Sequence, residues 1–280
     1  MTLLLTLLAS VLMLALIMAA AWVIQQRSGN SGWVDASWSF GVGLTGAAGA
    51  LAALTQDDAN VWRALTAALL AMTWGLRLGG HIFIRSRNSA DDPRYAALRA
   101  QWGADAPRKM FWFLQQQAWG SAPLVWAIIL AAWNPSPALR WFDLAAVLIA
   151  LAAIAFEHRA DKQLRRFVAN PANRGRICDE GLWAYSRHPN YFFQWMGWLA
   201  WPLMAISWEG GYASGWLSLI APALMYVFLT RVTGIPPLEE HMLRKHGDKF
   251  RAYQRTTPAF FPAILRGNHS QTQNRNAGSA

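Results

Sequence analysis

The chain has 280 residues, of which 54% are hydrophobic and only 14% are charged, and it contains 17 tryptophans. Soluble chains average roughly 25% charged residues, so this composition excludes an ordinary soluble domain. The formal charge of +10 lies in loops that flank apolar runs and not in a basic stripe, which excludes nucleic acid as a partner. The single cysteine, Cys178, excludes an intramolecular disulfide, and the six histidines show no spacing typical of a metal site.

Apolar runs long enough to cross a bilayer, about 17–25 residues each, recur along the chain. They predict an all-α polytopic membrane protein with seven spanning helices. No Lys or Arg precedes the first run, so we interpret it as a retained helix and not as a cleaved signal peptide. The predicted spans cover residues 2–24, 36–55, 61–84, 110–132, 141–157, 190–207 and 213–232.

Asp35 is the first acidic residue of the chain and stands at the start of the second predicted span. An acid at this place is often an N-cap that contributes about 1 kcal/mol. An acid at membrane depth is also a functional candidate. The sequence leaves both interpretations of Asp35 open.

The third predicted span carries Arg77, His81 and Arg85, which recur every four residues and therefore share one helix face. Such groups inside an apolar helix should face the interior of the bundle or a wet cavity. The alternative is that they extend to the membrane edge, which suits Arg85 better than Arg77 because Arg77 lies two turns deeper.

The segments between the spans are polar. Residues 85–109 form a loop with a short amphipathic piece that ends at Trp102, and the fifth helix is predicted to continue past the bilayer to Arg166. A surface helix is predicted from Leu238 to Tyr253, and the Asn- and Gln-rich residues 267–280 are predicted to be a disordered tail. We therefore expect one integral membrane domain over 1–266, with a cofactor-binding half over about 141–266.

The charge distribution predicts the orientation. The loops after the third and fifth spans and the C-terminal segment carry nearly all Lys and Arg, so these parts should be cytoplasmic and the N-terminus outside. The alternate loops and their edges hold Asp57, Asp58, Arg63, Arg140 and Glu209.

Residues 181–191 read GLWAYSRHPNY and end where a long apolar run begins. Pro189 suits the first turn of the helix that follows. Arg187 and His188 would then lie at the positively polarised start of that helix, where free backbone N–H groups favour an anion. The alternative is a membrane-interface anchor, with Arg187 on lipid headgroups.

Three predicted cytoplasmic segments, residues 157–166, 174–191 and 231–253, combine arginines with acceptors such as Asp161, Tyr185 and Glu239. A patch that only attracts lipid needs positive charge alone, whereas a sugar-phosphate also needs acceptors. No GxGxxG pattern follows a predicted strand, so a Rossmann domain is excluded. The arginine excess favours NADPH over S-adenosylmethionine, which carries a sulfonium and no phosphate.

The motif at 181–191, with Glu157 and Asp161 upstream and the tail from Tyr253 to Pro262, resembles the steroid 5α-reductase C-terminal domain superfamily. The closest resemblance is to its bacterial branch, the domain of unknown function DUF1295, over roughly residues 30–265. The motif is also similar to that of isoprenylcysteine carboxyl methyltransferases and sterol reductases. It is therefore specific for the superfamily and less so for the reaction.

The resemblance implies NADPH-dependent reduction of a carbon–carbon double bond conjugated to a carbonyl. The substrate would be a steroid-like or other lipid enone taken from the bilayer of a bacterial inner membrane, with the cofactor on the cytoplasmic side and no protein partner required. The residues that it implies around the cofactor are Glu157, Arg159, Asp161, Arg176, Arg187, Asn190, Tyr191, Arg231 and Tyr253. Their neighbours Tyr185, His188, Gln194 and Glu239 are further candidates.

The chain departs from the steroid reductases at the carbonyl-binding residues. Those enzymes hold the ketone with a Gln-Glu pair and a Tyr, whereas no Glu precedes Glu157 here and Ile82 stands beside His81. We predict that Asp35 and His81, together with Tyr95, replace that clamp and polarise the carbonyl. An S-adenosylmethionine-dependent lipid or isoprenylcysteine-type methyltransferase is the alternative function, and a non-catalytic lipid-binding subunit is the third.

Overall fold

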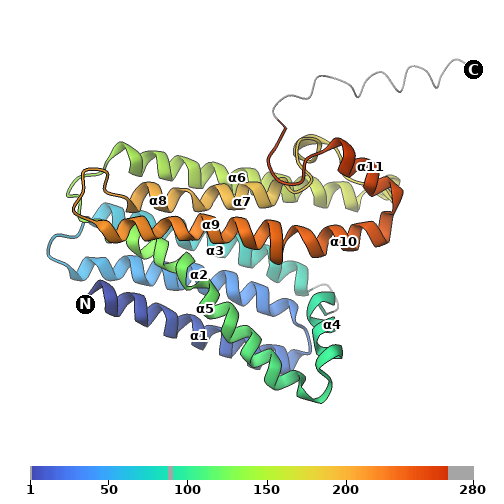
Figure 1. The fold of residues 1–280 in the computed structure, drawn as a ribbon, viewed down its shortest axis with the longest axis horizontal. Coiled ribbons are helices and arrows are strands. Elements are labelled where there is room, and N and C mark those ends of the chain that lie inside the picture. The colour runs from blue at the N-terminus through green and yellow to red at the C-terminus, as the bar shows by residue number, and fades with distance from the viewer. Residues whose placement is uncertain (1, 88–90, 264–280) are drawn as a thin grey trace, which may run out of the picture. The chain divides into compact units, whose positions relative to one another are not determined.

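A computed structural model describes residues 2–87 and 91–263 (Figure 1). Within these residues all regular structure is helical, as predicted. The tail predicted over 267–280 lies outside the described residues. The α-helices are α1 (Leu3–Ser28), α2 (Gly32–Leu51), α3 (Val61–Arg87), α4 (Pro93–Trp102), α5 (Ala106–Ala132), α6 (Trp141–Ala169), α7 (Pro189–Trp198), α8 (Ala200–Ala205), α9 (Ile220–Val227), α10 (Ile235–His246) and α11 (Asp248–Thr256).

Within the described residues, five helical segments are long and apolar enough to cross a membrane. The segment expected over 110–132 is the 27-residue helix α5, and the one expected over 190–207 is divided into α7 and α8. Neither belongs to the five, so the number seven and the orientation of the termini stay predictions. The five segments are Leu3–Ser28, Gly32–Thr55, Val61–Arg87, Trp141–Ala169 and Ala213–His246.

Helix α1 has the side-chain distribution of a helix that faces lipid. Leu4, Leu8, Leu12 and Leu16 recur every four residues and are each more than half exposed. Polar residues of the same helix are buried instead, with Ser10 at only 4% exposure. This arrangement is the reverse of that in a water-soluble helix, because the apolar face of α1 points away from the bundle.

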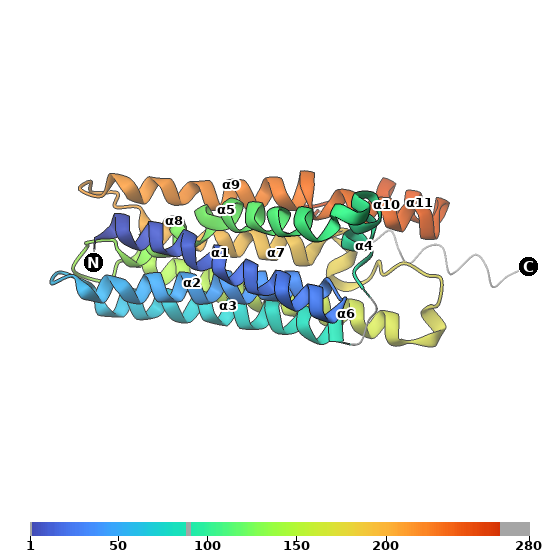
Figure 2. The same cartoon turned by 90° about the horizontal axis from the view of Figure 1, so that it is seen from below.

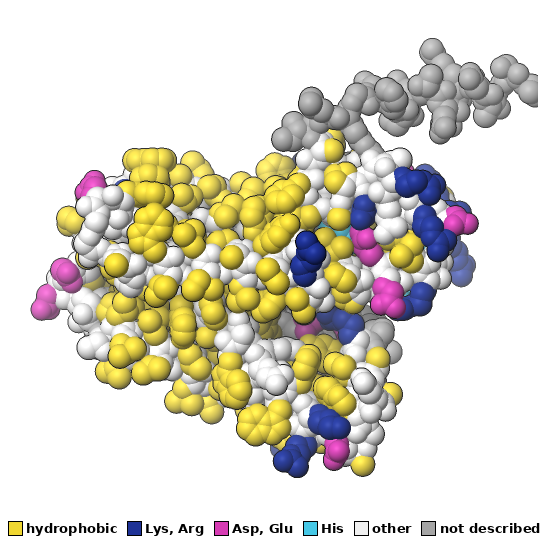
Figure 3. Space-filling view, in the orientation of Figure 1, with side chains coloured by type: hydrophobic (Ala, Val, Ile, Leu, Met, Phe, Trp, Pro, Cys, Tyr) yellow, Lys and Arg dark blue, Asp and Glu magenta, His cyan; other side chains and the backbone are white. Residues whose placement is uncertain are grey.

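The chain divides into two compact units, which we describe separately. Unit 1 comprises Met1–Leu151 and Trp198–Ala223, and unit 2 comprises Ala152–Gly197 and Leu224–Ala280. In unit 1, helices α1, α2, α3 and α5 pack on one another, and α2 and α3 run alongside each other over their lengths (Figures 1 and 2). Lys and Arg gather at α4 and the start of α5 in unit 1, and at α10 and α11 in unit 2 (Figure 3).

The contact between α2 and α3 depends on two facing glycines. A Cβ atom added at Gly43 would lie 2.9 Å from the Ala71 carbonyl oxygen and 2.9 Å from the Gly75 Cα. A Cβ at Gly75 would lie 2.9 Å from the Gly43 Cα. Because backbone meets backbone here, neither glycine can gain a side chain without separating the two helices.

Arg63 holds together the turn between α5 and α6. The charge pattern places Arg63 at the edge of an outer loop, but the structure buries it completely, at 0% exposure. Its Nη2 lies 3.0 Å from Asp143 Oδ2, and its guanidinium donates to the carbonyls of Asn134, Ser136 and Ala138 at 2.7–3.0 Å. The buried cation is therefore paired and hydrogen-bonded, which is the condition for its burial to be tolerated.

Unit 2 contains the C-terminal part of α6, nearly all of α7, the second half of α9, and the helices α10 and α11. As predicted, α6 continues well beyond residue 157. The surface helix predicted over 238–253 is instead two helices, because Gly247 with φ 53° interrupts it. The segment after α11 returns to α7 and α9 through an aromatic cluster of Phe192, Trp195, Tyr226, Phe260 and Phe261, with ring centroids 5.2–6.1 Å apart.

Candidate cofactor site

The motif loop, residues 181–188, is fixed to α6 before it reaches α7. Trp183 is buried against Phe167 and Cys178, and its indole Nε1 donates to the Ala160 carbonyl at 3.0 Å. Gly181 has a φ of +59°, and a Cβ there would meet the Gln163 side chain at 2.6 Å, so this turn requires glycine. The sequence prediction that a helix begins at Pro189 is confirmed, since α7 starts there.

Arg187 and Glu239 form the central ion pair of the site. Arg187 Nε lies 2.7 Å from Glu239 Oε1 and Nη2 lies 3.1 Å from Oε2, so the guanidinium binds the carboxylate through two parallel bonds. Gln254 Nε2 also donates to Oε2, at 2.8 Å. This bidentate geometry orders α10 against the motif loop.

Arg187 also binds the segment that follows α11, which we call the C-terminal strap (residues 257–263). Its Nη1 donates to the Thr257 carbonyl at 2.5 Å, and its backbone N–H donates to the Pro258 carbonyl at 2.9 Å. Ser186 Oγ donates to the Phe260 carbonyl at 2.9 Å. The Arg187 guanidinium is thus bound to Glu239 and the strap. Its main role is to hold these segments together, and little of its charge is left to bind a ligand.

His188 is buried, with 3% exposure, beside this ion pair. Its Nε2 lies 2.9 Å from Glu239 Oε1, and its ring stacks on Tyr191 with centroids 5.6 Å apart and planes 11° from parallel. Because the carboxylate can only accept, Nε2 carries the proton and Nδ1 presents a lone pair. Nδ1 has no hydrogen-bond partner among the described residues.

Burial lowers the pKa of His188 below its usual value of 6.5, although Glu239 acts in the opposite direction. The ring is therefore neutral at neutral pH, with an acceptor atom that is buried and available. Buried polar atoms are nearly always paired in native proteins, so an unpaired one at a candidate site indicates a missing partner.

Asn190 connects the start of α7 to α6. Its Nδ2 donates to Asp161 Oδ1 at 3.1 Å, while its own Oδ1 accepts from the Tyr191 N–H at 3.0 Å. One turn before Asp161 on α6, Glu157 is buried at 3% exposure, and Gln194 is buried on α7. The structure therefore joins Asp161 of α6 to Asn190 at the start of α7 within unit 2.

Tyr253 has an internal role similar to that of Arg187. It is buried on α11, and its hydroxyl donates to the Trp183 carbonyl at 2.5 Å. Tyr185, in contrast, is 46% exposed and is held through its backbone, since its N–H donates to the Leu182 carbonyl at 3.2 Å and its carbonyl accepts from the Ala263 N–H at 3.0 Å. Tyr253 thus fixes the motif loop, whereas the Tyr185 side chain is open to solvent or ligand.

The remaining predicted arginines of unit 2 are exposed. Arg231 lies in a π-helical turn (Phe228–Val232), a distortion found frequently at functional sites. Arg176 Nη1 donates to Asn173 Oδ1 at 3.1 Å, and its guanidinium lies over the Phe167 ring. Arg159 is exposed on α6 between the two buried acids. These three cations are the accessible ones of the predicted set.

The predicted catalytic residues belong to unit 1. Tyr95 is 5% exposed, and its hydroxyl donates to Asp35 Oδ1 at 2.7 Å, while Arg94 Nη2 lies 2.5 Å from Asp35 Oδ2. Asp35 is not the N-cap of α2, because Ser31 holds that position and Asp35 lies in the first turn. His81 is half-buried on α3. The structure thus joins two of the three predicted residues directly.

Burial raises the pKa of Tyr95 well above its usual range, and the Asp35 carboxylate raises it further. Gln117 Nε2 donates to the same hydroxyl at 3.4 Å. The phenol therefore stays protonated throughout the physiological range, and its proton is held at Oη toward Asp35. This group can donate a hydrogen bond but cannot act as a base.

Several residues that build the site were not predicted from the sequence. Gln163, Ser186, Gln254 and Thr257 position the loop or the strap through hydrogen bonds. Ser186 stands inside the motif and Gln254 directly follows Tyr253, so their proximity to predicted residues was an available signal. Gln163 and Thr257 carry no such signal. The Gln163 side chain binds the backbone N–H of Leu182, and Thr257 contributes only its backbone carbonyl.

The fold and this network define an all-helical protein with apolar helices of membrane-spanning length and a buried polar cluster in its C-terminal unit. The family model described as protein of unknown function (DUF1295) matches residues 21–257. The chain belongs to this family, which confirms the family predicted from the motif at 181–191. No curated protein and no solved structure matches the chain.

Proposed function

We propose that the protein is an NADPH-dependent membrane reductase that acts on a carbon–carbon double bond conjugated to a carbonyl in a lipid-soluble substrate. The observation that supports this best is the network of the buried His188 with the partly buried Arg187 and Glu239, in which His188 Nδ1 has no partner among the described residues. Burying charged and polar groups costs free energy. A purely structural scaffold would therefore have little reason to retain them.

The groups of unit 2 suit NADPH chemically. The exposed Arg159, Arg176 and Arg231 offer bidentate donors of the kind that bind phosphate groups. The lone pair of His188 Nδ1 suits a hydroxyl donor, such as a ribose hydroxyl. When bound, NADPH would supply the hydride for the reduction. S-adenosylmethionine would leave the arginines without a phosphate to bind.

The carbonyl of the substrate needs a hydrogen-bond donor that stabilises the developing enolate. We assign this role to the Tyr95 hydroxyl, held by Asp35, with His81 as a further candidate. The high pKa of Tyr95 keeps its proton at Oη, which fits a donor. The assignment is separate from that of the cofactor residues and has its own test.

The first experiment measures binding to the full-length protein in detergent by thermal unfolding with NADPH, NADH and S-adenosylmethionine. A ligand that binds only the folded state raises stability by about 2.7 kcal/mol at a hundredfold excess over Kd. We expect a shift with NADPH. His188→Gln keeps an amide donor for Glu239 and removes the Nδ1 acceptor, so it should weaken NADPH binding about tenfold.

The matched control is His241→Gln, an exposed histidine two residues from Glu239 on α10, which should bind NADPH normally. Arg187→Ala is a poor test, because it would remove the strap contacts as well. A shift with S-adenosylmethionine and none with NADPH would overturn the reductase proposal in favour of the methyltransferase. Unchanged NADPH binding in His188→Gln would overturn the assignment of Nδ1.

Turnover is measured as loss of NADPH absorbance with a panel of steroid-like, isoprenoid and fatty enones. Tyr95→Phe and Asp35→Asn should retain the NADPH-induced shift and lose most of the turnover, since one donor of this kind is worth about 10²–10³ in rate. His81→Ala tests the third residue. Full turnover in all three variants would show that the carbonyl is held elsewhere.

A further inference from the structure

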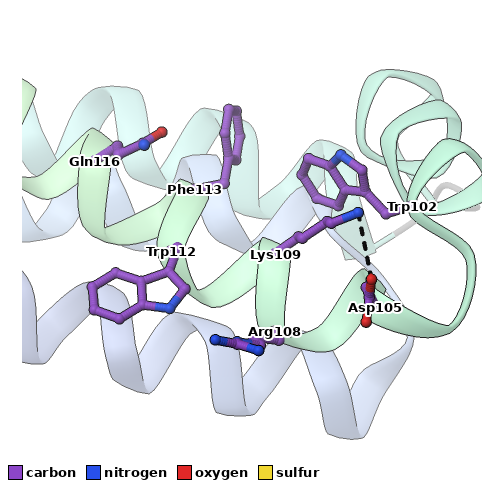
Figure 4. A pocket seen from close by; sticks show the side chains of 7 residues that line it. All are labelled: Trp102, Asp105, Arg108, Lys109, Trp112, Phe113 and Gln116. Atoms are coloured by element: carbon purple, nitrogen blue, oxygen red, sulfur yellow. Dashed lines mark ion pairs between the residues drawn. The ribbon is translucent and has the colours of Figure 1, made fainter.

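A pocket of ≈ 410 Å³ lies in unit 1 at the corner where α4 meets α5, and none of the residues that line it has a role in the proposed function. Figure 4 shows Lys109 and Phe113 on one side of α5, with Trp102 facing them from the end of α4, and Arg108 and Trp112 on an adjacent side of α5. The full lining is Trp102, Asp105, Arg108, Lys109, Trp112, Phe113 and Gln116.

The charged groups of the pocket leave a net positive charge. Lys109 Nζ lies 3.6 Å from Asp105 Oδ2, so one of the two cations has a partial partner. Arg108 is exposed and has no ion-pair or hydrogen-bond partner among the described residues. The pocket therefore presents a free guanidinium and an ammonium that is shared weakly, which together favour an anion.

The aromatic walls of the pocket are held in place before any ligand binds. The rings of Trp102 and Phe113 lie 6.0 Å apart, and Tyr95 contacts Phe113 from α4 at 6.2 Å. The start of α5 is fixed to α1, because the Trp22 indole donates to the Pro107 carbonyl at 2.9 Å. A rigid wall lowers the entropy lost on binding.

An apolar track leaves the pocket along α5. Trp112 and Trp119 are 51% and 50% exposed, and their rings lie 6.5 Å apart, two turns of the same helix. No charged residue occurs from Met110 to Ala132. Cationic groups at one end of an exposed aromatic surface match an amphiphile whose negative head lies at Arg108 and Lys109 and whose chains lie along the tryptophans.

We infer that this pocket binds an anionic phospholipid of the surrounding bilayer, with the lipid phosphate on Arg108 and Lys109 and an acyl chain on Trp112 and Trp119. Basic pockets beside apolar helices are suited to such headgroups. A soluble phosphate would use the cations and leave the exposed tryptophans without a role. A nonionic lipid would contact the tryptophans and leave Arg108 and Lys109 without an anion to bind.

The test uses the full-length protein in a neutral detergent, to which phosphatidylglycerol, phosphatidylcholine or inorganic phosphate is added. Thermal unfolding gives an apparent affinity, and native mass spectrometry counts the lipids that stay bound. Phosphatidylglycerol should stabilise the protein and be retained, and the double variant Arg108→Gln/Lys109→Gln should bind it about tenfold more weakly. Arg108→Lys, which keeps the charge, should bind nearly normally.

The control is Arg244→Gln/Arg251→Gln, which removes two exposed arginines of unit 2 and should leave phosphatidylglycerol binding unchanged. Trp112→Ala should weaken retention of the lipid while leaving the charge intact. Equal stabilisation by phosphatidylcholine, or unchanged binding in the Arg108/Lys109 variant, would overturn the inference. If inorganic phosphate alone reproduced the shift and displaced the lipid, the ligand would be a soluble anion and the lipid assignment would be wrong.

Discussion

The charge state of His188 depends on the folded structure. Its ring is buried, one nitrogen is bound to Glu239, and burial lowers its pKa below 6.5. The unfolded chain binds a proton on this histidine near pH 6.5, whereas the folded protein binds it only at lower pH. The folded state is therefore favoured above pH 6.5 and loses this advantage as the pH falls below it.

We predict that the thermal stability of the protein falls when the pH is lowered from about 7.5 to about 5.5, and that His188→Gln falls less over the same range. The glutamine does not titrate, so its variant lacks this proton-linked term. Unfolding scans at matched ionic strength measure the difference, with His241→Gln as the control that should follow the unmodified protein. Parallel curves for all three proteins would exclude His188 as the source.

At the scale of elements, the contact of α2 and α3 is a close approach of backbone to backbone at two glycines. Gly43 and Gly75 meet there, and the neighbouring Gly80 of α3 has nothing within 4 Å of an added Cβ. A methyl group added at Gly75 would therefore meet the α2 backbone, whereas one added at Gly80 would meet no atom within 4 Å. A substitution at Gly80 can therefore serve as the control for one at Gly75 in the same helix.

We predict that Gly75→Ala destabilises the protein by about 1–3 kcal/mol, because the added Cβ forces α2 and α3 apart. Gly80→Ala should leave stability unchanged or raise it by up to about 1 kcal/mol, since alanine favours the helix more than glycine. Unfolding in mixed micelles with increasing denaturing detergent compares the variants. If Gly75→Ala were as stable as Gly80→Ala, the close approach would not limit the packing of these helices.

Helices were predictable because apolar runs and breaking residues mark them in the sequence. Pro189 starts α7, and Gly210 and Gly211 lie with positive φ in the turn after α8. The start of α2 was placed four residues late because Asp35 resembled a cap, whereas Ser31 holds that position. The helix break at Gly247 was missed because the charged pattern continues through it.

The site was predictable by residue type but not by role. The sequence indicates that Arg187, His188 and Glu239 belong to one cluster, yet it cannot show that Arg187 is bound to Glu239, 52 positions away, and to the carbonyls of the strap. Every residue type has a backbone carbonyl, so the residue type does not show which carbonyl accepts a hydrogen bond. The same reason hides the burial of Arg63, whose partners include three carbonyl groups.

For the whole molecule, the orientation in the membrane is the prediction with the widest consequences, because it decides from which side a cofactor could enter. The chain is well suited to a labelling test. Its single cysteine, Cys178, is buried, and burial raises the pKa of its thiol to about 11. Since the thiolate is the reactive form, Cys178 should react slowly with maleimides.

We predict that a membrane-impermeant maleimide labels Asp57→Cys in intact cells and labels Lys245→Cys only after the cells are permeabilised. Both positions are exposed in the structure, and they lie in segments whose charges place them outside and in the cytoplasm. The unsubstituted chain provides the background. The reverse labelling pattern would show that the orientation is inverted, and labelling of both in intact cells would contradict the predicted topology.

The buried pair of Arg63 and Asp143 also has a consequence for how the protein is made. The two residues are 80 positions apart, so α3 leaves the ribosome long before α6 supplies the carboxylate. Until then, Arg63, which is completely buried in the folded protein, has neither the Asp143 carboxylate nor the turn carbonyls that it binds there. The nascent chain must therefore keep the start of α3 near the aqueous face or the insertion machinery, and unit 1 can close only after α6 has been synthesised. A chain interrupted before Asp143 would retain an arginine without the carboxylate that it binds in the folded protein.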